Sequence, residues 1–268
     1  EKSRNLMTVR IAQNLGINKI AKFSQELGIY ENPEELLSIS LGSNETTLLR
    51  LTSAYSAFVN KGKLVKPILI DRIQDSEGNT ILNNEKRSCI NCDQISYTSK
   101  EFPQIKDNYK QVFSAETAYQ ITSLLEGVIK RGTGKKLKKL KLNLAGKTGT
   151  TNENNDAWFI GFTSNLVIGV YVGMDNPKPL GKFETGSKTA LPIFSSFVKK
   201  AVKKYDARPF KVADGITMMV VDPLTGQKAK FSSKDTIVEA YKSKNVIDGK
   251  VLYSNSDRLD TNNILKFY

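Results

Sequence analysis

The chain of 268 residues contains no histidine. This absence excludes a Ser-His-Asp triad, a Cys-His pair and any histidine metal ligand within these residues. If the chain belongs to an enzyme, Lys, Tyr, Asp or Glu must transfer the protons. Cysteine is scarce too, with only Cys89 and Cys92, spaced C-x-x-C in a polar stretch. Two further zinc ligands and a redox-type βαβ pattern are both missing around the pair, so a local disulfide is the preferred interpretation.

Long apolar runs are also missing, and none approaches the roughly 20 residues that cross a bilayer as a helix. No signal peptide is visible, and the sequence opens with Glu1 and Lys2. We therefore expect a segment of a longer protein, with any anchor or export signal upstream. The net charge of +13 favours an anionic partner such as a nucleic acid, a membrane surface or an acidic polymer. A lysine-rich, solvated surface explains that charge equally well.

What is present is a pattern typical of an α+β fold, with helices on either side of a short antiparallel sheet. We expect a main unit over 1–207, with a polar, irregular insertion at about 83–112, and a small β-rich extension over 208–268. Helices are predicted over 5–27 as a pair around Gly16, at about 45–60, after the cap Ser114 as far as Arg131, and over 191–205. Strands are predicted over 143–150, 156–162 and 166–174, with a hairpin over 67–82.

The sharpest local motif is the run from Ala145 to Thr151, Ala-Gly-Lys-Thr-Gly-Thr-Thr. A phosphate-binding loop would need a glycine where Lys141 stands and a helix starting at Lys147, so we reject it. A glycine-rich strand end with an exposed lysine remains open as a purely structural interpretation. The third interpretation is the Lys-Thr-Gly strand of serine acyltransferases that react with penicillins. There the lysine supplies charge, threonine hydroxyls donate to a substrate carboxylate, and glycine lets the substrate backbone approach.

That third interpretation requires a Ser-x-Asn motif upstream of the strand. Ser3-Arg4-Asn5 fits, and Ser243-Lys244-Asn245 has the same letters. The first precedes Lys147 and opens a helix, whereas the second lies in the β-rich extension. Order and context therefore favour Ser3 and Asn5.

Longer stretches around both motifs resemble class A penicillin-binding proteins. The run from Ser3 to Arg10 resembles their second active-site motif, and Gly146–Asn152 followed by Asp156–Phe162 is similar to their third motif and its neighbouring strand. The helix from Ser114 that closes with Arg-Gly-Thr-Gly, and the stretch from Glu184 to Phe194, also look familial. The likeness runs from Ser3 to about Gly215. It implies a serine β-lactamase/DD-transpeptidase-like fold, with 1–207 as a partial transpeptidase domain.

One departure concerns the nucleophile, which the family carries in a Ser-x-x-Lys motif ahead of Ser-x-Asn. The only Ser-x-x-Lys of this sequence is Ser196-Phe197-Val198-Lys199, which lies after Lys147 and on an amphipathic helix. We therefore expect the nucleophile upstream of Glu1 and expect this chain to be inactive alone. A catalytically dead penicillin-binding homologue is an alternative.

The resemblance implies a role for each matching residue. Ser3 would relay a proton, Asn5 would bind the substrate amide, and Lys147 would stay charged and stabilise that network. Thr148 and Thr150 would bind the terminal carboxylate, with Gly149 between them, and the Thr150 N–H would form half of the oxyanion hole.

The implied reaction is acyl transfer from D-Ala-D-Ala stem peptides of peptidoglycan through a serine acyl-enzyme, with β-lactam antibiotics as mimics. No cofactor, metal or nucleic acid is expected to take part. The parent protein would sit at the periplasmic face of the bacterial inner membrane, held by an upstream anchor, and would also carry a glycosyltransferase domain. We expect strand 143–150 at an edge of the sheet, facing helix 5–15.

A rival interpretation is a basic helix-turn-helix module that binds DNA. The run from Ile11 to Ala21 has the Ala…Gly spacing of such a motif, and the positive charge suits DNA. However, Lys19–Phe23 mixes polar with apolar residues where a recognition helix should expose polar ones. The module also leaves the strands over 142–174 unexplained.

Overall fold

The computed structural model describes residues 1–85, 87–92, 102–202, 208–223, 225–231, 233, 235–247 and 250–251. The α-helices are α1 (Asn5–Leu15), α2 (Ile17–Glu26), α3 (Leu48–Val59), α4 (Ala115–Arg131) and α5 (Ala190–Ala201). Short 3₁₀ helices are η1 (Leu37–Leu41), η2 (Lys135–Leu140), η3 (Asn152–Asn154) and η4 (Ser243–Asn245). The fold class is α+β, as predicted.

The central sheet has the antiparallel order β7-β8-β9, formed by Ala145–Thr150, Ala157–Phe162 and Val167–Val172. Within the described chain β7 pairs only with β8, so it is an edge strand, as predicted. The register places Lys147 opposite Ile160, and Ile160 opposite Gly169. Because side chains alternate along a strand, these three residues share one face of the sheet.

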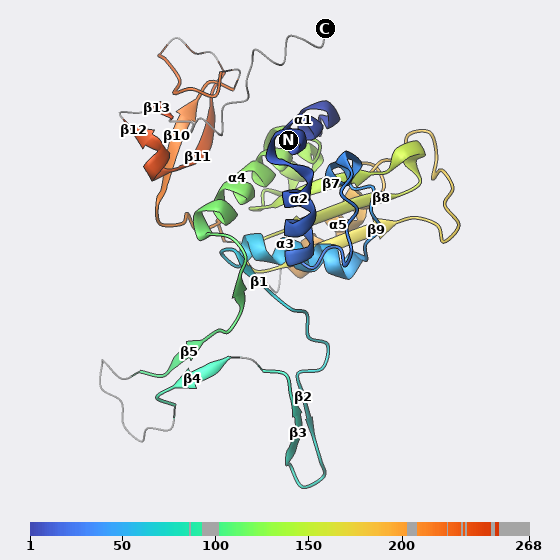
Figure 1. Cartoon of the computed structure of the whole chain (residues 1–268), viewed down its shortest axis with the longest axis vertical. Helices are drawn as coiled ribbons and strands as arrows, with labels where there is room; N and C mark the ends of the chain where they lie inside the picture. Colours follow the sequence, from blue (N-terminus) through green and yellow to red (C-terminus); the bar gives the residue numbers. More distant parts are fainter. Residues whose placement is uncertain are drawn as a thin grey trace.

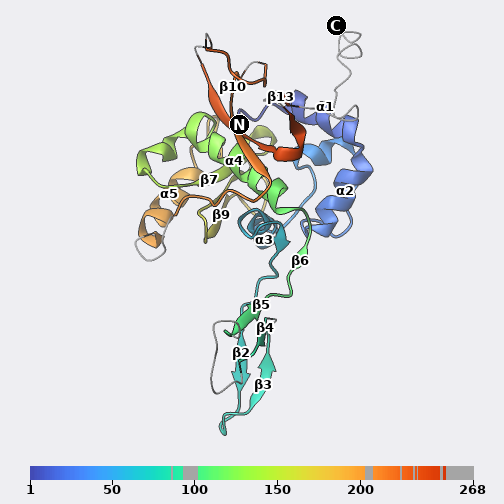
Figure 2. The ribbon, with the colours of Figure 1, turned by 90° about the vertical axis from the view of Figure 1, so that its left-hand side faces the viewer.

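Helices cover both faces of this sheet (Figures 1 and 2). On one face, the ring of Phe159 packs 4.7 Å from the ring of Phe194 on α5. On the other face, Tyr55 of α3 lies against Phe162, and Gly169 leaves room for the hydroxyl of Thr52. The largest buried side chains, Phe159, Phe162 and Phe194, therefore fix the sheet between its two helical layers.

Helix α4 begins where the sequence predicts, because the Ser114 hydroxyl accepts a hydrogen bond from the Thr117 N–H. It lies against β7 and contacts α3 and β11. Its carboxyl end is followed by η2, which leads into β7. Helix α4 thereby connects the sheet to the hairpin near the end of the chain.

An arm leaves the body between α3 and α4 and extends away from it in both views (Figures 1 and 2). It contains the pairs β2–β3 (Arg72–Gln74, Thr80–Asn83) and β4–β5 (Ser88–Ile90, Gln104–Lys106), and its base is β1–β6 (Lys63–Leu64, Lys110–Gln111). The predicted hairpin over 67–82 is confirmed with shorter strands. The expectation of an irregular insertion over 83–112 is wrong in part, because β4, β5 and β6 lie there. Cys89 and Cys92 form the predicted local disulfide.

The C-terminal part holds an antiparallel hairpin of β10 (Ile216–Val221) and β11 (Ile237–Lys242), then β12 (Val246–Ile247) and β13 (Lys250–Val251). The hairpin is attached to α4, where the side-chain amide of Gln120 donates to the Ala240 carbonyl at 2.9 Å. Residues 203–207, at the predicted end of the last helix, lie outside the described residues. Within that limit α5 confirms the helix predicted over 191–205.

Candidate active site

The centre of the site is a hydrogen bond between two residues 144 positions apart. The ammonium group of Lys147 on β7 donates to the hydroxyl oxygen of Ser3 at 2.6 Å, and to the Thr148 carbonyl at 2.8 Å. Lys147 is partly buried and Ser3 is exposed. The structure thus brings together the two motif residues that sequence order alone left far apart.

Ser3 reaches Lys147 from a short segment ahead of α1. Its φ angle is 51°, in the left-handed region that non-glycine residues seldom adopt. Asn5 begins α1 two residues later and is exposed to solvent. Asn5 is thus two positions along the chain from Ser3, and its contact with the substrate stays a prediction.

The environment of Lys147 weakens its hold on its proton. Burial of the side chain lowers the pKa of Lys147 below the ordinary value of a lysine. Both hydrogen bonds from the ammonium group go to neutral oxygens, which favour the charged form without cancelling the cost of burial. Burial and hydrogen bonding therefore act on the pKa of Lys147 in opposite directions, and burial is the larger effect.

Thr148 points to the opposite face of β7 from Lys147 and is nearly buried, with 9 % exposure. Its hydroxyl lies 2.7 Å from the hydroxyl of Thr133, where either oxygen can donate. Thr133 belongs to the Arg-Gly-Thr-Gly stretch that closes α4. Sequence reasoning noticed that stretch but gave Thr133 no role.

Thr150, near the end of β7, is exposed and has a different partner. The Gly186 N–H donates to the Thr150 hydroxyl oxygen at 3.0 Å. Gly186 lies directly on the strands, and a Cβ there would come closer than 3.0 Å to the carbonyl oxygens of Gly149 and Trp158. The Glu-Thr-Gly stretch was also noticed in the sequence, but its contact with Thr150 was not predicted.

The other motif matches lie elsewhere. Ser196 and Lys199 are exposed on α5, a helix that packs on β8 and β9 rather than on the β7 edge. Ser243 belongs to η4, and its hydroxyl lies 2.8 Å from that of Thr217 on β10. Neither serine shares the site of Lys147.

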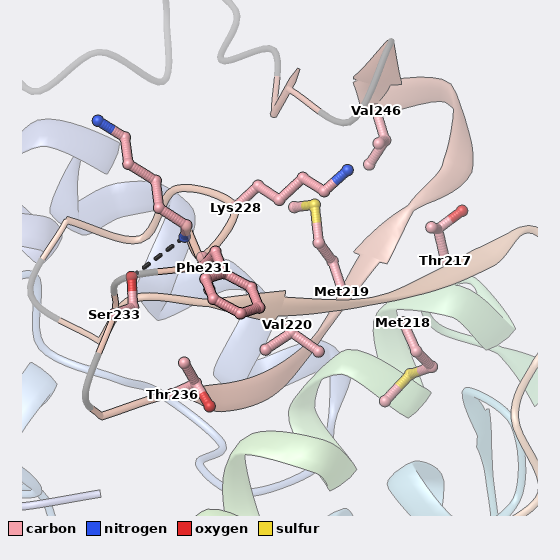
Figure 3. A pocket seen from close by; sticks show the side chains of 11 residues that line it. Thr217, Met218, Met219, Val220, Lys228, Phe231, Ser233, Thr236 and Val246 are labelled. Atoms are coloured by element: carbon pink, nitrogen blue, oxygen red, sulfur yellow. Dashed lines mark hydrogen bonds between the residues drawn. The ribbon is translucent and has the colours of Figure 1, made fainter.

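One hollow of the described surface is also separate from this site. It has a volume of about 750 Å³ and lies along the β10–β11 hairpin, where Met219, Phe231 and Lys228 are among its lining residues (Figure 3). None of its described lining residues carries a carboxylate. The Lys147–Ser3 pair at the open edge of β7 is therefore the stronger candidate for chemistry than this hollow.

Two features are missing from the described residues. No group of three or more His, Cys, Asp or Glu side chains there is arranged to hold a metal ion. None of the helices in that part of the chain combines the length and the apolar character that a bilayer crossing requires.

Comparison with known proteins agrees with this geometry. Residues 1–199 match the family described as the penicillin binding protein transpeptidase domain. The chain is 41 % identical over 266 residues to penicillin-binding protein 1A of Rickettsia bellii, covering 98 % of this chain and 33 % of that protein. It is 31 % identical over 275 residues to penicillin-binding protein 1A of Pseudomonas aeruginosa, covering 90 % of this chain and 33 % of that protein.

Among solved structures, penicillin-binding protein 1A of Haemophilus influenzae superposes with a TM-score of 0.77 at 29 % identity. That match covers 95 % of this chain and 40 % of the other. The chain spans about a third of the length of the relatives named above. None of these comparisons supports a DNA-binding module, and the ring of Phe23 on α2 packs 6.0 Å from that of Phe113 in the body. The chain therefore belongs to the penicillin-binding transpeptidase domain family, in its class A branch.

Proposed function

We propose that this chain supplies the substrate-binding side of an active site that cross-links peptidoglycan stem peptides through a serine acyl-enzyme. The observation that carries the proposal is the hydrogen bond from Lys147 to Ser3 at the open edge of β7. Membership of the transpeptidase family supports it independently. The nucleophilic serine would come from a Ser-x-x-Lys segment ahead of Glu1, since no such motif precedes Ser3 in this chain.

In the first half of the reaction, the serine oxygen attacks the carbonyl carbon between the two D-alanines. The new C–O bond replaces the C–N bond, and the leaving nitrogen must gain a proton. Lys147 donates a hydrogen bond to the Ser3 oxygen, so the hydroxyl hydrogen of Ser3 must point away from Lys147. That hydrogen can pass as a proton to the leaving nitrogen. Ser3 then regains a proton from the nucleophile through the motif lysine. In the second half, a neighbouring amine attacks the ester and the same protons move in reverse.

The edge of β7 suits an extended peptide as substrate. In the described chain β7 pairs only with β8, so its other side offers backbone N–H and C=O groups to an added strand. Gly149 carries no side chain that would hinder this approach. The Thr150 N–H is the proposed protein donor to the oxyanion, together with the N–H of the absent serine.

The two threonines would take different parts in holding the terminal carboxylate. The exposed Thr150 accepts the Gly186 N–H through a lone pair, which leaves its own proton available for a ligand. Thr148 is nearly buried and shares its hydroxyl with Thr133. We therefore propose Thr150 as the direct donor and Thr148 as a donor whose proton is set by Thr133. Asn5 would bind the substrate amide.

The wider setting is also part of the proposal. Stem peptides ending in D-Ala-D-Ala and β-lactams would be the ligands, at the periplasmic face of the inner membrane. A parent protein of this class would carry an upstream anchor and a glycosyltransferase domain, while residues 208–268 form an extension of the transpeptidase unit. The matched relatives, about three times the length of this chain, have room for such additions.

The test uses a longer chain that carries a Ser-x-x-Lys segment ahead of Glu1, labelled with a fluorescent penicillin. Lys147→Ala should slow acylation by about 100-fold or more, because acid–base groups contribute roughly 10²–10⁴. Lys139→Ala is the control, since Lys139 is exposed on η2. An unchanged rate in the Lys147 variant would refute the role of this lysine. Absence of labelling in the longer parent chain would favour a catalytically dead homologue, and the 268-residue chain itself should form no adduct.

A further inference from the structure

One arginine joins both ends of the described chain. Arg131, the last residue of α4, uses Nη2 to donate to Glu1 Oε1 at 2.6 Å and to Glu239 Oε1 at 2.9 Å. Glu1 lies two residues before Ser3, and Glu239 lies on β11. The exposed fraction of the side chain is 20 % for Glu1, 32 % for Arg131 and 16 % for Glu239. This is a partly buried ionic cluster rather than a loose surface pair.

Helix α4 is shaped to receive Glu1. A Cβ on Gly127 would collide with the Glu1 carboxylate, and a Cβ on Gly132 would lie 2.6 Å from the Glu1 carbonyl oxygen. The Thr133 N–H donates to that same carbonyl at 3.4 Å. Glu1 therefore rests against the carboxyl end of α4 with both its side chain and its backbone.

The contacts of Glu1 with the carboxyl end of α4 restrict the position of Ser3. Only Lys2 lies between them, and Ser3 then turns through its left-handed φ angle toward Lys147. Thr133, which holds the Glu1 carbonyl, also bonds Thr148 on β7. Thr133, just beyond the end of α4, thus contacts Glu1, two residues before Ser3, and Thr148, the neighbour of Lys147 on β7.

Glu239, the third residue of the cluster, connects the β10–β11 hairpin to the carboxyl end of α4. Glu239 lies outside residues 1–199, the range that matches the transpeptidase family. Its strand β11 packs on α4, where Gln120 also donates to Ala240. Figure 2 shows the hairpin running alongside α4 near the amino terminus. Without Glu239, the guanidinium of Arg131 would be free to turn away from Glu1.

We propose that Glu1, Arg131 and Glu239 form an ionic brace through which the β10–β11 hairpin holds Ser3 within hydrogen-bonding distance of Lys147. These are positioning residues, because their ion pairs join the start of the chain to α4 and β11 and none of them is proposed to touch the substrate. The inference rests on the proposed function, since Ser3 must act in acylation for its position to matter.

The test measures acylation by a fluorescent penicillin in the longer chain that carries the Ser-x-x-Lys segment, separating the acylation rate constant from the binding constant. Glu239→Gln should lower the rate constant by about two- to fivefold, the upper part of the range expected for one partly exposed ion pair, with little change in binding. Arg131→Gln should do the same, and Arg131→Lys should recover part of the loss. The matched control is Glu126→Gln. Glu126 pairs with Lys130 on the same helix at 3.1 Å, and its side chain has the same 16 % exposure as Glu239.

A second variant separates positioning from stability. Gly127→Ala should favour the helix, because alanine is a better helix former than glycine, yet it would displace the Glu1 carboxylate. We expect slower acylation without a lower melting temperature. Amide exchange in the peptide covering residues 3–11 should become faster in both Glu239→Gln and Gly127→Ala, and should stay unchanged in Glu126→Gln.

The outcomes separate the two proposals. If Lys147→Ala stops acylation while the Glu239, Arg131 and Gly127 variants all react like the parent, the brace is wrong and the proposed function stands. If Lys147→Ala reacts normally, the proposed function fails. If the variants lose only thermal stability and keep their rate constant, the cluster is structural and the brace is again wrong.

Discussion

Gly186→Ala is the sharpest available perturbation of the Thr150 hydroxyl. A Cβ at this position would come closer than 3.0 Å to two backbone carbonyl oxygens, those of Gly149 and Trp158, and neither can move without disturbing the β7–β8 ladder. The segment that carries residue 186 must therefore lift away. That movement would break the hydrogen bond from the Gly186 N–H to Thr150, which is 3.0 Å long.

The expected size of the effect follows from the steric overlap at residue 186 and from the lost hydrogen bond to Thr150. Overpacking of a well-packed site costs about 1–3 kcal/mol in free energy of unfolding. Loss of the hydrogen bond to Thr150 is worth about 0.5–1.5 kcal/mol, and since roughly 1.4 kcal/mol is a factor of ten, penicillin acylation should fall about three- to tenfold. Most of the fall should be in affinity, because Thr150 is proposed to hold the ligand carboxylate.

The assay combines urea unfolding with penicillin labelling of the longer chain. Ser187→Ala is the control, because Ser187 neighbours Gly186 and its hydroxyl lies 3.0 Å from that of Thr185 rather than against Thr150. This control should leave acylation unchanged. Wild-type affinity for penicillin in Gly186→Ala, together with a measurable loss of stability, would show that the Gly186 contact does not orient Thr150.

Three further predictions concern single groups. Thr133→Val should lower the free energy of unfolding by about 1–3 kcal/mol in urea titrations, because it leaves the buried Thr148 hydroxyl without its 2.7 Å partner; equal stability would contradict this. Burial lowers the pKa of Lys147, so the unfolded chain binds the proton more tightly. The contribution of Lys147 to stability should therefore rise with pH between its folded pKa and about 10.4, and Lys147→Met should remove that slope; identical slopes would contradict it. Reduction of Cys89–Cys92 should leave acylation of the longer chain unchanged, because the disulfide lies on the arm; slower labelling with reductant would link the arm to the site.

The parts of the fold that sequence predicted well are those that bury apolar side chains. Helix α4 carries apolar residues at the spacing of its buried face, strand β8 is an apolar run buried on both faces, and both lie where they were expected. The arm is different. All residues of β4 and β5 are exposed, and each strand has only 3 residues, too few for a pattern of apolar and polar residues to mark it as a strand. That is why the stretch over 83–112 looked irregular.

The candidate site also has a part that the sequence could predict and a part that it could not. The meeting of Ser3 with Lys147 could be expected, because two short motifs of known order point to one groove. The partners of Thr148 and Thr150 could not, because Thr133 and Gly186 act through contacts that no local pattern encodes. The stretches around them were visible only as glycine-containing sequences. A glycine signals that something lies close by, but the sequence does not say which segment that is.

The energetics of the segment ahead of α1 explain why the site needs more than its central hydrogen bond. Fixing the backbone of a residue costs about 1–2 kcal/mol, so ordering the four residues Glu1 to Arg4 costs about 4–8 kcal/mol. A hydrogen bond from a charged donor such as Lys147 returns about 1.5–3 kcal/mol. That bond alone would leave Ser3 mobile, whereas the proposed proton relay needs Ser3 to stay in place. The contacts of Glu1 with Arg131 and with the Thr133 N–H, at the carboxyl end of α4, offset part of the remaining free-energy cost of ordering this segment. The position of Ser3 should therefore be sensitive to charges on α4 and β11 that never contact the substrate.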